Sequence, residues 1–157
     1  MIQNSEYIKL KLKKYYDRPI ESDSAFNECS EIKDNIDLLI YLHMINDIRR
    51  INKFHELINS KLNQNGIYLC SIETLEQRRK RIRSRTSKGF KNIFRIIDFI
   101  YKRVIPKLPI LKNIYFSLTQ GRNRVISKAE ILGRLISCGF DILEYFEYEN
   151  LFYVIAK

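Results

Sequence analysis

The middle of the chain alternates between apolar runs and helical periodicity. The segment NIDLLIYLHMI, residues 35–45, is a continuous apolar run between polar residues, which is typical of a strand buried on both faces of a parallel sheet. From about residue 47 to residue 62, apolar residues recur at the spacing of one helix face, and NQNG (63–66) then predicts a turn. GIYLCSI (66–72) has the composition of a second strand, so the pattern predicts a βαβ unit with parallel strands.

The C-terminal part of the chain predicts a helix followed by an antiparallel hairpin. Ser127 and Glu130 have the spacing of a capping box and open a helix that we expect to reach Ile136, with a glycine just past its end. The strings DILEYFEY and LFYVIAK follow as two strands, joined across Glu149 and Asn150.

Two further regions are more polar or more basic. Residues 1–35 are polar, and the weak alternation in YIKLKL favours a short strand there. Thr74 and Gln77 form a second predicted capping box, which opens the basic helix LEQRRKRIRSR. In FKNIFRIIDFIYKRVI, residues 90–105, a broad apolar face is opposed by cations, so we expect residues 74–118 to form a helical basic insertion.

Together these elements predict an α/β fold in a single domain spanning residues 1–157. The expected architecture is a partial Rossmann-like, mostly parallel sheet that ends in a C-terminal antiparallel hairpin and carries the basic helical insertion. Its parts are a poorly defined N-terminal segment (1–35), a strand-helix-strand unit (36–73), the insertion (74–118) and the final helix with its hairpin (119–157). A hydrophobic fraction of 45% with 29% charged residues is typical of a globular protein.

The chain is strongly basic, with a net charge of +10 and a pI near 9.6. Such a charge favours polyanionic partners, namely nucleic acid, an anionic membrane surface or phosphorylated small molecules. The basic helix and the amphipathic segment after it combine cations with a wide apolar face, as interfacial helices do. The residues predicted to meet a membrane surface are Arg78, Arg79, Arg81, Arg95, Lys102 and Arg103. Two alternatives remain open for this region, a solvated or core-packing helix face and an RNA-binding surface.

The cysteines and the N-terminus indicate a reducing compartment. Cys29, Cys70 and Cys138 are odd in number and far apart, without a CxxC or Cys/His spacing, so neither a disulfide framework nor a metal site is predicted. The N-terminus lacks an apolar core of signal-peptide length, and no stretch approaches the roughly 18 apolar residues that a membrane-spanning helix needs. We therefore expect a cytoplasmic protein that can lie peripherally on the inner face of the cytoplasmic membrane.

Polar side chains gather where the first predicted strand ends. They are His43, Asn46, Asp47, Arg49 and Arg50. Open α/β sheets place their ligands at the carboxyl ends of parallel strands, which makes this group a candidate ligand site. Alternatively, the group fixes the next helix to the sheet. Asn46 or Asp47 can cap the start of that helix. His55 lies on the inward face of that helix, so we expect a hydrogen-bonded core histidine rather than a general base.

A second candidate site precedes the final helix, in the string QGRNRVISKAE. Its members are Arg122, Asn123, Arg124 and Lys128. Free backbone N–H groups and cationic side chains both attract anions at a helix N-terminus, so these residues are candidates for binding an anion or a phosphate. The alternative is a loop whose arginines cap carbonyl groups and meet neighbouring carboxylates.

The order strand, helix, strand, inserted helices, helix, CGF, strand, strand resembles the C-terminal half of a class I S-adenosylmethionine-dependent methyltransferase. IDLLIYLHMI resembles that family's fourth strand and GIYLCSIET its fifth, and SKAEILGRLISCGFDILEYFEYENLFYVIAK resembles its final helix, turn and last two strands. The resemblance covers roughly residues 36–157 and implies a methyltransferase-like sheet. The family's glycine-rich loop after the first strand, and its acidic residue after the second, have no counterpart here.

A closer resemblance is carried by the strings LHMINDIRRINKF, KRVIPKLP and TQGRNRVISKAEILGRLISCGF, with ET followed by a basic helix. They resemble the region that precedes the catalytic part of bacterial polyprenyl-phosphate glycosyl-1-phosphate transferases, the sugar transferases that begin surface-polysaccharide synthesis. The basic-aromatic and Asp-Glu motifs of that catalytic part are absent from this chain.

These resemblances imply an accessory, non-catalytic, methyltransferase-like module of a sugar transferase in bacterial exopolysaccharide biosynthesis, docking at the cytoplasmic membrane face. No catalytic residue, metal or cofactor is expected, and S-adenosylmethionine would need a substitute for the missing glycine-rich loop. The expected partners are an anionic membrane surface or the catalytic region of the sugar transferase, with nucleic acid less favoured. Two alternatives remain open, a methyltransferase that is complete only with its cofactor half or another chain, and a basic RNA-binding module.

Overall fold

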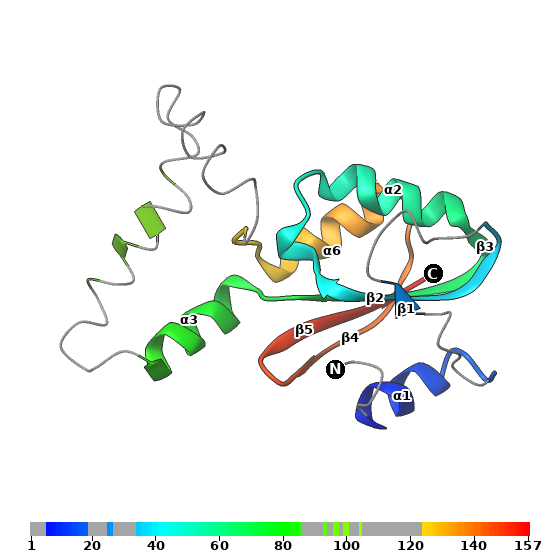
Figure 1. The fold of residues 1–157 in the computed structure, drawn as a ribbon, viewed down its shortest axis with the longest axis horizontal. Helices are drawn as coiled ribbons and strands as arrows, with labels where there is room; N and C mark the ends of the chain where they lie inside the picture. Colours follow the sequence, from blue (N-terminus) through cyan, green and yellow to red (C-terminus); the bar gives the residue numbers. More distant parts are fainter. Residues whose placement is uncertain are drawn as a thin grey trace.

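The computed structural model describes residues 6–18, 25–26, 34–85 and 124–157, and the single positions 93, 96, 97, 99, 100 and 104. The described strands form one five-stranded sheet in the order β1-β2-β3-β5-β4 (Figure 1). The strands are β1 (Ala25–Phe26), β2 (Ile36–Met44), β3 (Leu62–Ile72), β4 (Ile142–Tyr148) and β5 (Leu151–Ala156). The protein therefore has the expected α/β fold.

The sheet is mixed, with a parallel half and an antiparallel half. β1 pairs with β2 and β2 with β3 in parallel, so the predicted strand-helix-strand unit is confirmed. β5 runs antiparallel to both β3 and β4, and its Val154 lies between Cys70 and Tyr145. The predicted hairpin is confirmed too. Its two-residue turn has positive φ at Glu149 (47°) and Asn150 (61°), the geometry that matches the twist of the strands.

Helices cover both faces of the sheet. Figure 1 shows α2 (Ile51–Lys61) and α6 (Lys128–Ser137) on one face and α1 (Glu6–Lys13) on the other. Tyr68 of β3 packs with inward residues of α2 and α6, including Ile58, Ile131 and Leu135, all fully buried. Each such side chain contributes roughly 1.5–3 kcal/mol of apolar burial. The opposite face is a smaller core, in which Ile8 and Leu12 of α1 cover β-strand residues.

Both predicted helix starts are confirmed. The capping box at Thr74 is reciprocal, whereas at Ser127 only the hydroxyl half is formed, because the Glu130 carboxylate pairs with Arg134. The Ser127 hydroxyl accepts a hydrogen bond from the Glu130 N–H (3.2 Å), and α6 begins at the next residue. At α3 (Leu75–Arg85), the Thr74 N–H donates to Gln77 Oε1 (2.9 Å), and the Gln77 N–H donates to Thr74 Oγ1 (3.4 Å). α6 ends before Gly139, whose φ of 89° suits glycine. These local signals are strong because each satisfies backbone groups that a helix end leaves unpaired.

Two sequence-based expectations for the conformation of short segments are wrong. YIKLKL is helical rather than extended, because Ile8 and Leu12 lie one turn apart and both are buried, whereas Leu10 is 69% exposed. NQNG is part of β3 rather than a turn. Ile36 pairs with Leu62 and Leu38 with Ile67, so residues 63–66 form an irregularity within the strand pair.

The helix after β2 begins later than predicted. Residues 45–47 form the short 3-10 helix η4 (Ile45–Asp47), and α2 begins at Ile51 with Arg50 as its N-cap and no side-chain cap. Neither Asn46 nor Asp47 caps it, because Asn46 is committed to hydrogen bonds with other segments. The rest of the predicted helical insertion, from residue 86 to residue 118, lies outside the described residues, apart from the six single positions.

Candidate functional site

Asn46 joins three segments at the carboxyl end of β2. Its side chain is 2% exposed. Its amide nitrogen donates to the carbonyls of Glu73 (2.9 Å) and Arg124 (2.7 Å), and its amide oxygen accepts from the Glu73 N–H (2.7 Å). The Asn46 carbonyl accepts from the Arg124 N–H (2.9 Å). Both amide hydrogens and the oxygen are thus occupied by backbone partners, so Asn46 serves the fold at this edge.

The other members of the predicted sheet-edge group are dispersed. His43 is exposed and lies edge-on to Tyr41, with 6.2 Å between ring centroids. Arg49 and Arg50 are exposed as well. Asp47 alone contributes to a surface depression of about 500 Å³ at this edge. The depression is lined by Met44, Asp47, Glu73, Arg81, Glu149, Asn150 and Leu151.

Sequence reasoning missed Glu73, Arg81 and the hairpin turn as parts of this depression. Glu73 follows the second parallel strand directly, and the carboxyl ends of parallel strands share one sheet edge. That rule could have found Glu73 in the sequence. The turn 149–151 could not be found in this way, because its position depends on β5 inserting between β3 and β4.

Glu73 holds two arginines of α3. Its side chain is 12% exposed and accepts from Arg81 Nε (2.6 Å) and Nη2 (2.8 Å), a bidentate pair. Arg78 Nη1 lies 3.7 Å from the same carboxylate, and Arg78 is buried. Two of the residues predicted to meet a membrane surface therefore face the body of the protein.

The outer face of α3 is different. Arg79 and Arg83 are exposed and form no ion pair with the described residues. Lys80 lies 3.6 Å from Glu147 of β4. Figure 1 shows α3 extending away from the sheet, and Arg79, Lys80 and Arg83 are exposed on it. The remaining predicted membrane-surface residues, Arg95, Lys102 and Arg103, lie outside the described part of the chain.

The structure describes two of the four predicted anion-site residues, and both have partners within the protein. Arg124 Nη1 donates to the Arg49 carbonyl (3.1 Å). Lys128 Nζ lies 2.7 Å from Glu147 and 2.9 Å from Glu76, and these carboxylates raise the pKa of Lys128 to about 12. Arg122 and Asn123 lie outside the described residues. Arg124 and Lys128 thus tie the start of α6 to its neighbours.

Apolar side chains are exposed between 93 and 104. The six positions described there are Ile93, Ile96, Ile97, Phe99, Ile100 and Val104, with exposed fractions from 36% to 58%. They make up half of the large apolar residues that are exposed in the described chain. Scattered exposed apolar side chains are ordinary, but a dense group of them usually marks an interaction surface.

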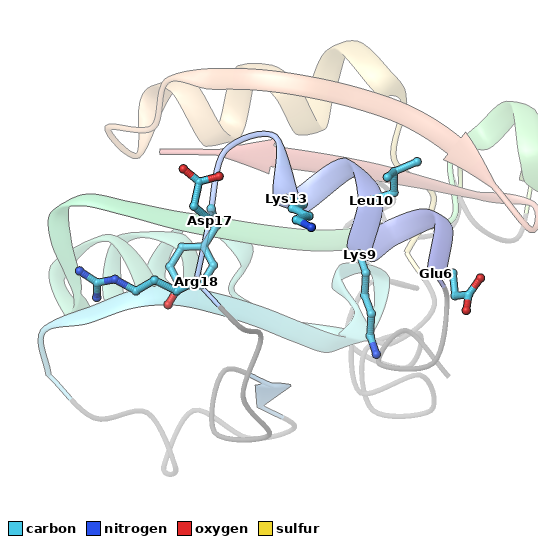
Figure 2. A pocket seen from close by; sticks show the side chains of 7 residues that line it. Glu6, Lys9, Leu10, Lys13, Asp17 and Arg18 are labelled. Carbon is cyan, nitrogen blue, oxygen red and sulfur yellow. The ribbon is translucent and has the colours of Figure 1, made fainter.

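A second depression, of about 470 Å³, lies along α1. It is lined by Glu6, Lys9, Leu10, Lys13, Tyr16, Asp17 and Arg18 (Figure 2). Lys9 and Lys13 are exposed, one helical turn apart, and neither forms an ion pair within the described chain. Lys11 instead turns to Glu144 of β4, which also accepts a hydrogen bond from the Tyr15 hydroxyl (3.0 Å). Glu144 thereby fastens α1 to the edge of the sheet.

His55 is a core histidine without the expected hydrogen bonds. It is fully buried on α2 among Phe54, Tyr68 and Phe140, and neither ring nitrogen has a hydrogen-bond partner among the described residues. Burial and, secondarily, the positive charge of Arg134 lower the pKa of His55 to about 4. The ring is therefore neutral near pH 7 and packs like an aromatic core residue. The expectation of burial is confirmed, but that of a hydrogen-bonded ring is wrong.

Other reactive groups offer little chemistry in the described part of the chain. Burial raises the pKa of the Cys70 thiol to about 12, and burial also raises that of Cys138. Both cysteines are free thiols. No group of three His, Cys, Asp or Glu side chains is placed to hold a metal ion in the ranges that the structure describes. None of the helices described there is long and apolar enough to cross a membrane.

Comparisons with known proteins find similarity to solved structures but no match in sequence. No family model matches the sequence, and no curated protein matches it. A crystal structure described as that of a possible exported protein from Bordetella parapertussis is similar, with 13% sequence identity and a TM-score of 0.47. The similarity covers 83% of this chain but 42% of that one, so this chain spans less than half the length of the similar protein.

Proposed function

We propose that the protein is a non-catalytic, methyltransferase-like accessory module associated with a sugar transferase of bacterial surface-polysaccharide biosynthesis, positioned at the cytoplasmic membrane face. The observation that carries the non-catalytic part is the use of Asn46. At the sheet edge where a methyltransferase would meet its cofactor and substrate, this side chain is saturated by the backbone of Glu73 and Arg124.

The order of the described elements supports the methyltransferase-like part. β2, α2 and β3 are followed by α3, then by α6, Gly139 and the β4–β5 hairpin, which is the order expected from the resemblance to the C-terminal half of that family. The association with a sugar transferase rests on the sequence strings around Asn46, Thr74 and Ser127. In the structure these three positions lie at one junction, since Thr74 bridges to Ile126 and Asn46 bonds Arg124.

One observation favours a second function. The depression of about 500 Å³ beside Asp47 lies at the carboxyl ends of β2 and β3, where open α/β sheets place ligands. This position of the depression supports the alternative of a methyltransferase that is complete only with its cofactor half or another chain. The basic RNA-binding alternative is supported by the net charge of +10 alone.

Isothermal calorimetry tests the proposal that the protein is non-catalytic. Purified protein, shown to be folded by circular dichroism, is titrated with S-adenosylmethionine and with S-adenosylhomocysteine. We expect no heat of binding. Micromolar binding of either compound would favour the methyltransferase, and Asp47→Asn should then weaken it. Asp141→Asn is the matched control, because Asp141 is exposed at the opposite end of the sheet, hydrogen-bonded through its backbone to Lys157.

Co-expression tests the association. The chain is expressed with the catalytic region of a polyprenyl-phosphate sugar-1-phosphate transferase from the same genome, and the mixture is passed through a size-exclusion column. The proposal expects the two to co-elute. Separate elution of two folded proteins would contradict it.

A further inference from the structure

The cations of α3 are sorted into two sets by the fold. Arg78 and Arg81 share the carboxylate of Glu73, and Lys80 lies 3.6 Å from Glu147, so these three cations have carboxylate partners within the protein. Arg79 and Arg83 are exposed and have no carboxylate within ion-pair distance in the described chain. They lie four residues apart on one helix face, where two like charges repel each other. An external anionic surface would relieve that repulsion.

The exposed apolar residues follow α3 closely in the chain. Ile93, Ile97, Ile100 and Val104 have spacings of four, three and four residues, which is the pattern of one helix face, and all four are exposed. Ile93 is eight residues beyond Arg85, so it lies within about 28 Å of the end of α3 even if the link is fully extended. The arginines and the apolar side chains can therefore contact one flat surface.

We infer that the outer face of α3 and the exposed apolar residues between 93 and 104 dock the protein on an anionic lipid bilayer. Arg79 and Arg83 contact lipid phosphates, and Ile93, Ile97 and Ile100 enter the interfacial layer. This inference rests on the proposed position at the membrane face but not on the association with a transferase.

An anionic bilayer is the occupant that matches both features. It offers phosphates to guanidinium groups and an apolar layer to aliphatic side chains, and it attracts a protein of charge +10. A nucleic acid offers phosphates but no apolar layer. RNA-binding surfaces stack bases on exposed aromatic rings, whereas five of the six described apolar residues between 93 and 104 are aliphatic.

Vesicle co-sedimentation tests the inference. The full chain is mixed with phosphatidylcholine vesicles that either contain or lack phosphatidylglycerol, at low and at high salt. We expect binding to the anionic vesicles only, weakened by salt. Arg79→Gln with Arg83→Gln should lower the partition coefficient about 25-fold, since each basic residue near an anionic surface contributes about fivefold.

Two matched controls separate a docking surface from net charge and general stickiness. Lys9→Gln with Lys13→Gln removes the same charge from two exposed, unpaired residues of α1 (Figure 2), and should change binding by no more than about twofold. Ile97→Ser with Ile100→Ser should weaken binding at least about tenfold. Leu57→Ser, at an exposed apolar residue of α2, should leave it unchanged.

Several outcomes would overturn the inference. One is an equal loss of binding in the Lys9/Lys13 variant, which would indicate a response to net charge alone. Another is binding of RNA by a chain that ignores anionic vesicles. If vesicle binding fails while co-elution with the transferase persists, the docking surface is wrong and the association stands. If co-elution fails while the protein still binds the vesicles, the association is wrong and the docking surface stands.

Discussion

α6 and the six described residues between 93 and 104 have similar apolar spacing but opposite exposure to solvent. In α6, Ile131 and Leu135 are fully buried against the sheet and α2. Between 93 and 104, Ile93 and Ile97 occupy the same spacing yet are 52% and 56% exposed. Helical periodicity therefore shows that a face is apolar without showing what covers it. α6 is placed by its Ser127 cap and by Arg134, whose guanidinium contacts both Glu130 and Asn52 of α2.

The largest expected effect is a cavity beneath α6. Leu135→Ala removes a fully buried side chain, so the free energy of unfolding should fall by about 3 kcal/mol, whereas Ile97→Ala should change it by less than about 0.5 kcal/mol. Urea denaturation of both variants measures the difference. Equal losses would mean that the stretch from 93 to 104 is packed in solution, and the contrast between the two regions would fail.

The buried histidine of α2 should make the same core sensitive to acid. The pKa of His55 is about 4 in the folded protein, below the ordinary value of 6.5, so between these pH values the unfolded chain binds more protons than the folded one. Stability is then full above about pH 6.5 and falls as the pH drops towards 4, by up to about 3 kcal/mol. Denaturation at a series of pH values measures this loss.

His55→Phe is the sharper version of that experiment. The ring lacks hydrogen-bond partners among the described residues and lies among aromatic side chains, so phenylalanine should fit and remove the slope between pH 6.5 and 4.5. The loss of stability below pH 4.5 should persist in this variant. Lys11 lowers the pKa of Glu144 and Lys128 lowers that of Glu147, and each carboxyl group loses this attraction when it is protonated. An unchanged slope above pH 4.5 would assign the titration to another group.

The junction at Asn46 should contribute less than the core but more than any surface bond. Asn46→Ala leaves the buried Glu73 N–H and two carbonyls without their partner, and should cost about 2 kcal/mol. Asn52→Ala is the control, because the Asn52 side chain is exposed and accepts a single bond from Arg134 (2.6 Å). A loss in the control as large as that in Asn46→Ala would contradict the ranking.

The smallest expected effect lies on the outer face of α3. Arg79→Gln with Arg83→Gln should leave the unfolding free energy within about 0.5 kcal/mol, since neither residue has an ion-pair partner in the described chain. Arg81→Gln should cost about 1 kcal/mol, because it removes a bidentate bond from the Glu73 carboxylate, whose side chain is 12% exposed. Thermal unfolding of the two variants distinguishes them, and the reverse order would mean that the outer arginines are paired in solution.

The parts of the fold that the sequence predicted are those with strong local signals. β2 is a long apolar run, and α6 has both a capping box and a glycine after its end. α1 was misjudged because the six residues from Ile8 to Lys13, which alternate between apolar side chains and Lys, fit a strand as well as a helix. Only the packing of Ile8 and Leu12 decides between the two. The strand irregularity at 63–66 depends on pairing with β2, which no local pattern contains.

The candidate site was predicted less well, for a related reason. Proximity to the end of β2 identified Asp47, but the rest of its depression comes from elements that tertiary structure brings together. The sequence also could not sort the arginines of α3. Which of them face inward depends on where Glu73 lies, and that position follows from the end of β3 rather than from the helix itself.

The bridge between Thr74 and Ile126 has a consequence for how the sequence of this protein can vary in evolution. Together with the Leu75 N–H to Ile126 carbonyl bond (2.9 Å), it brings the two ends of the intervening stretch to one point on the sheet. Within the part of the chain that the structure describes, the sheet and the helices α1, α2 and α6 that cover it are formed by residues outside that stretch. Lengthening a loop whose ends are already fixed together costs little free energy. Natural variants can therefore exchange or resize the stretch after α3, and with it the surface that the protein presents, while inheriting the same sheet.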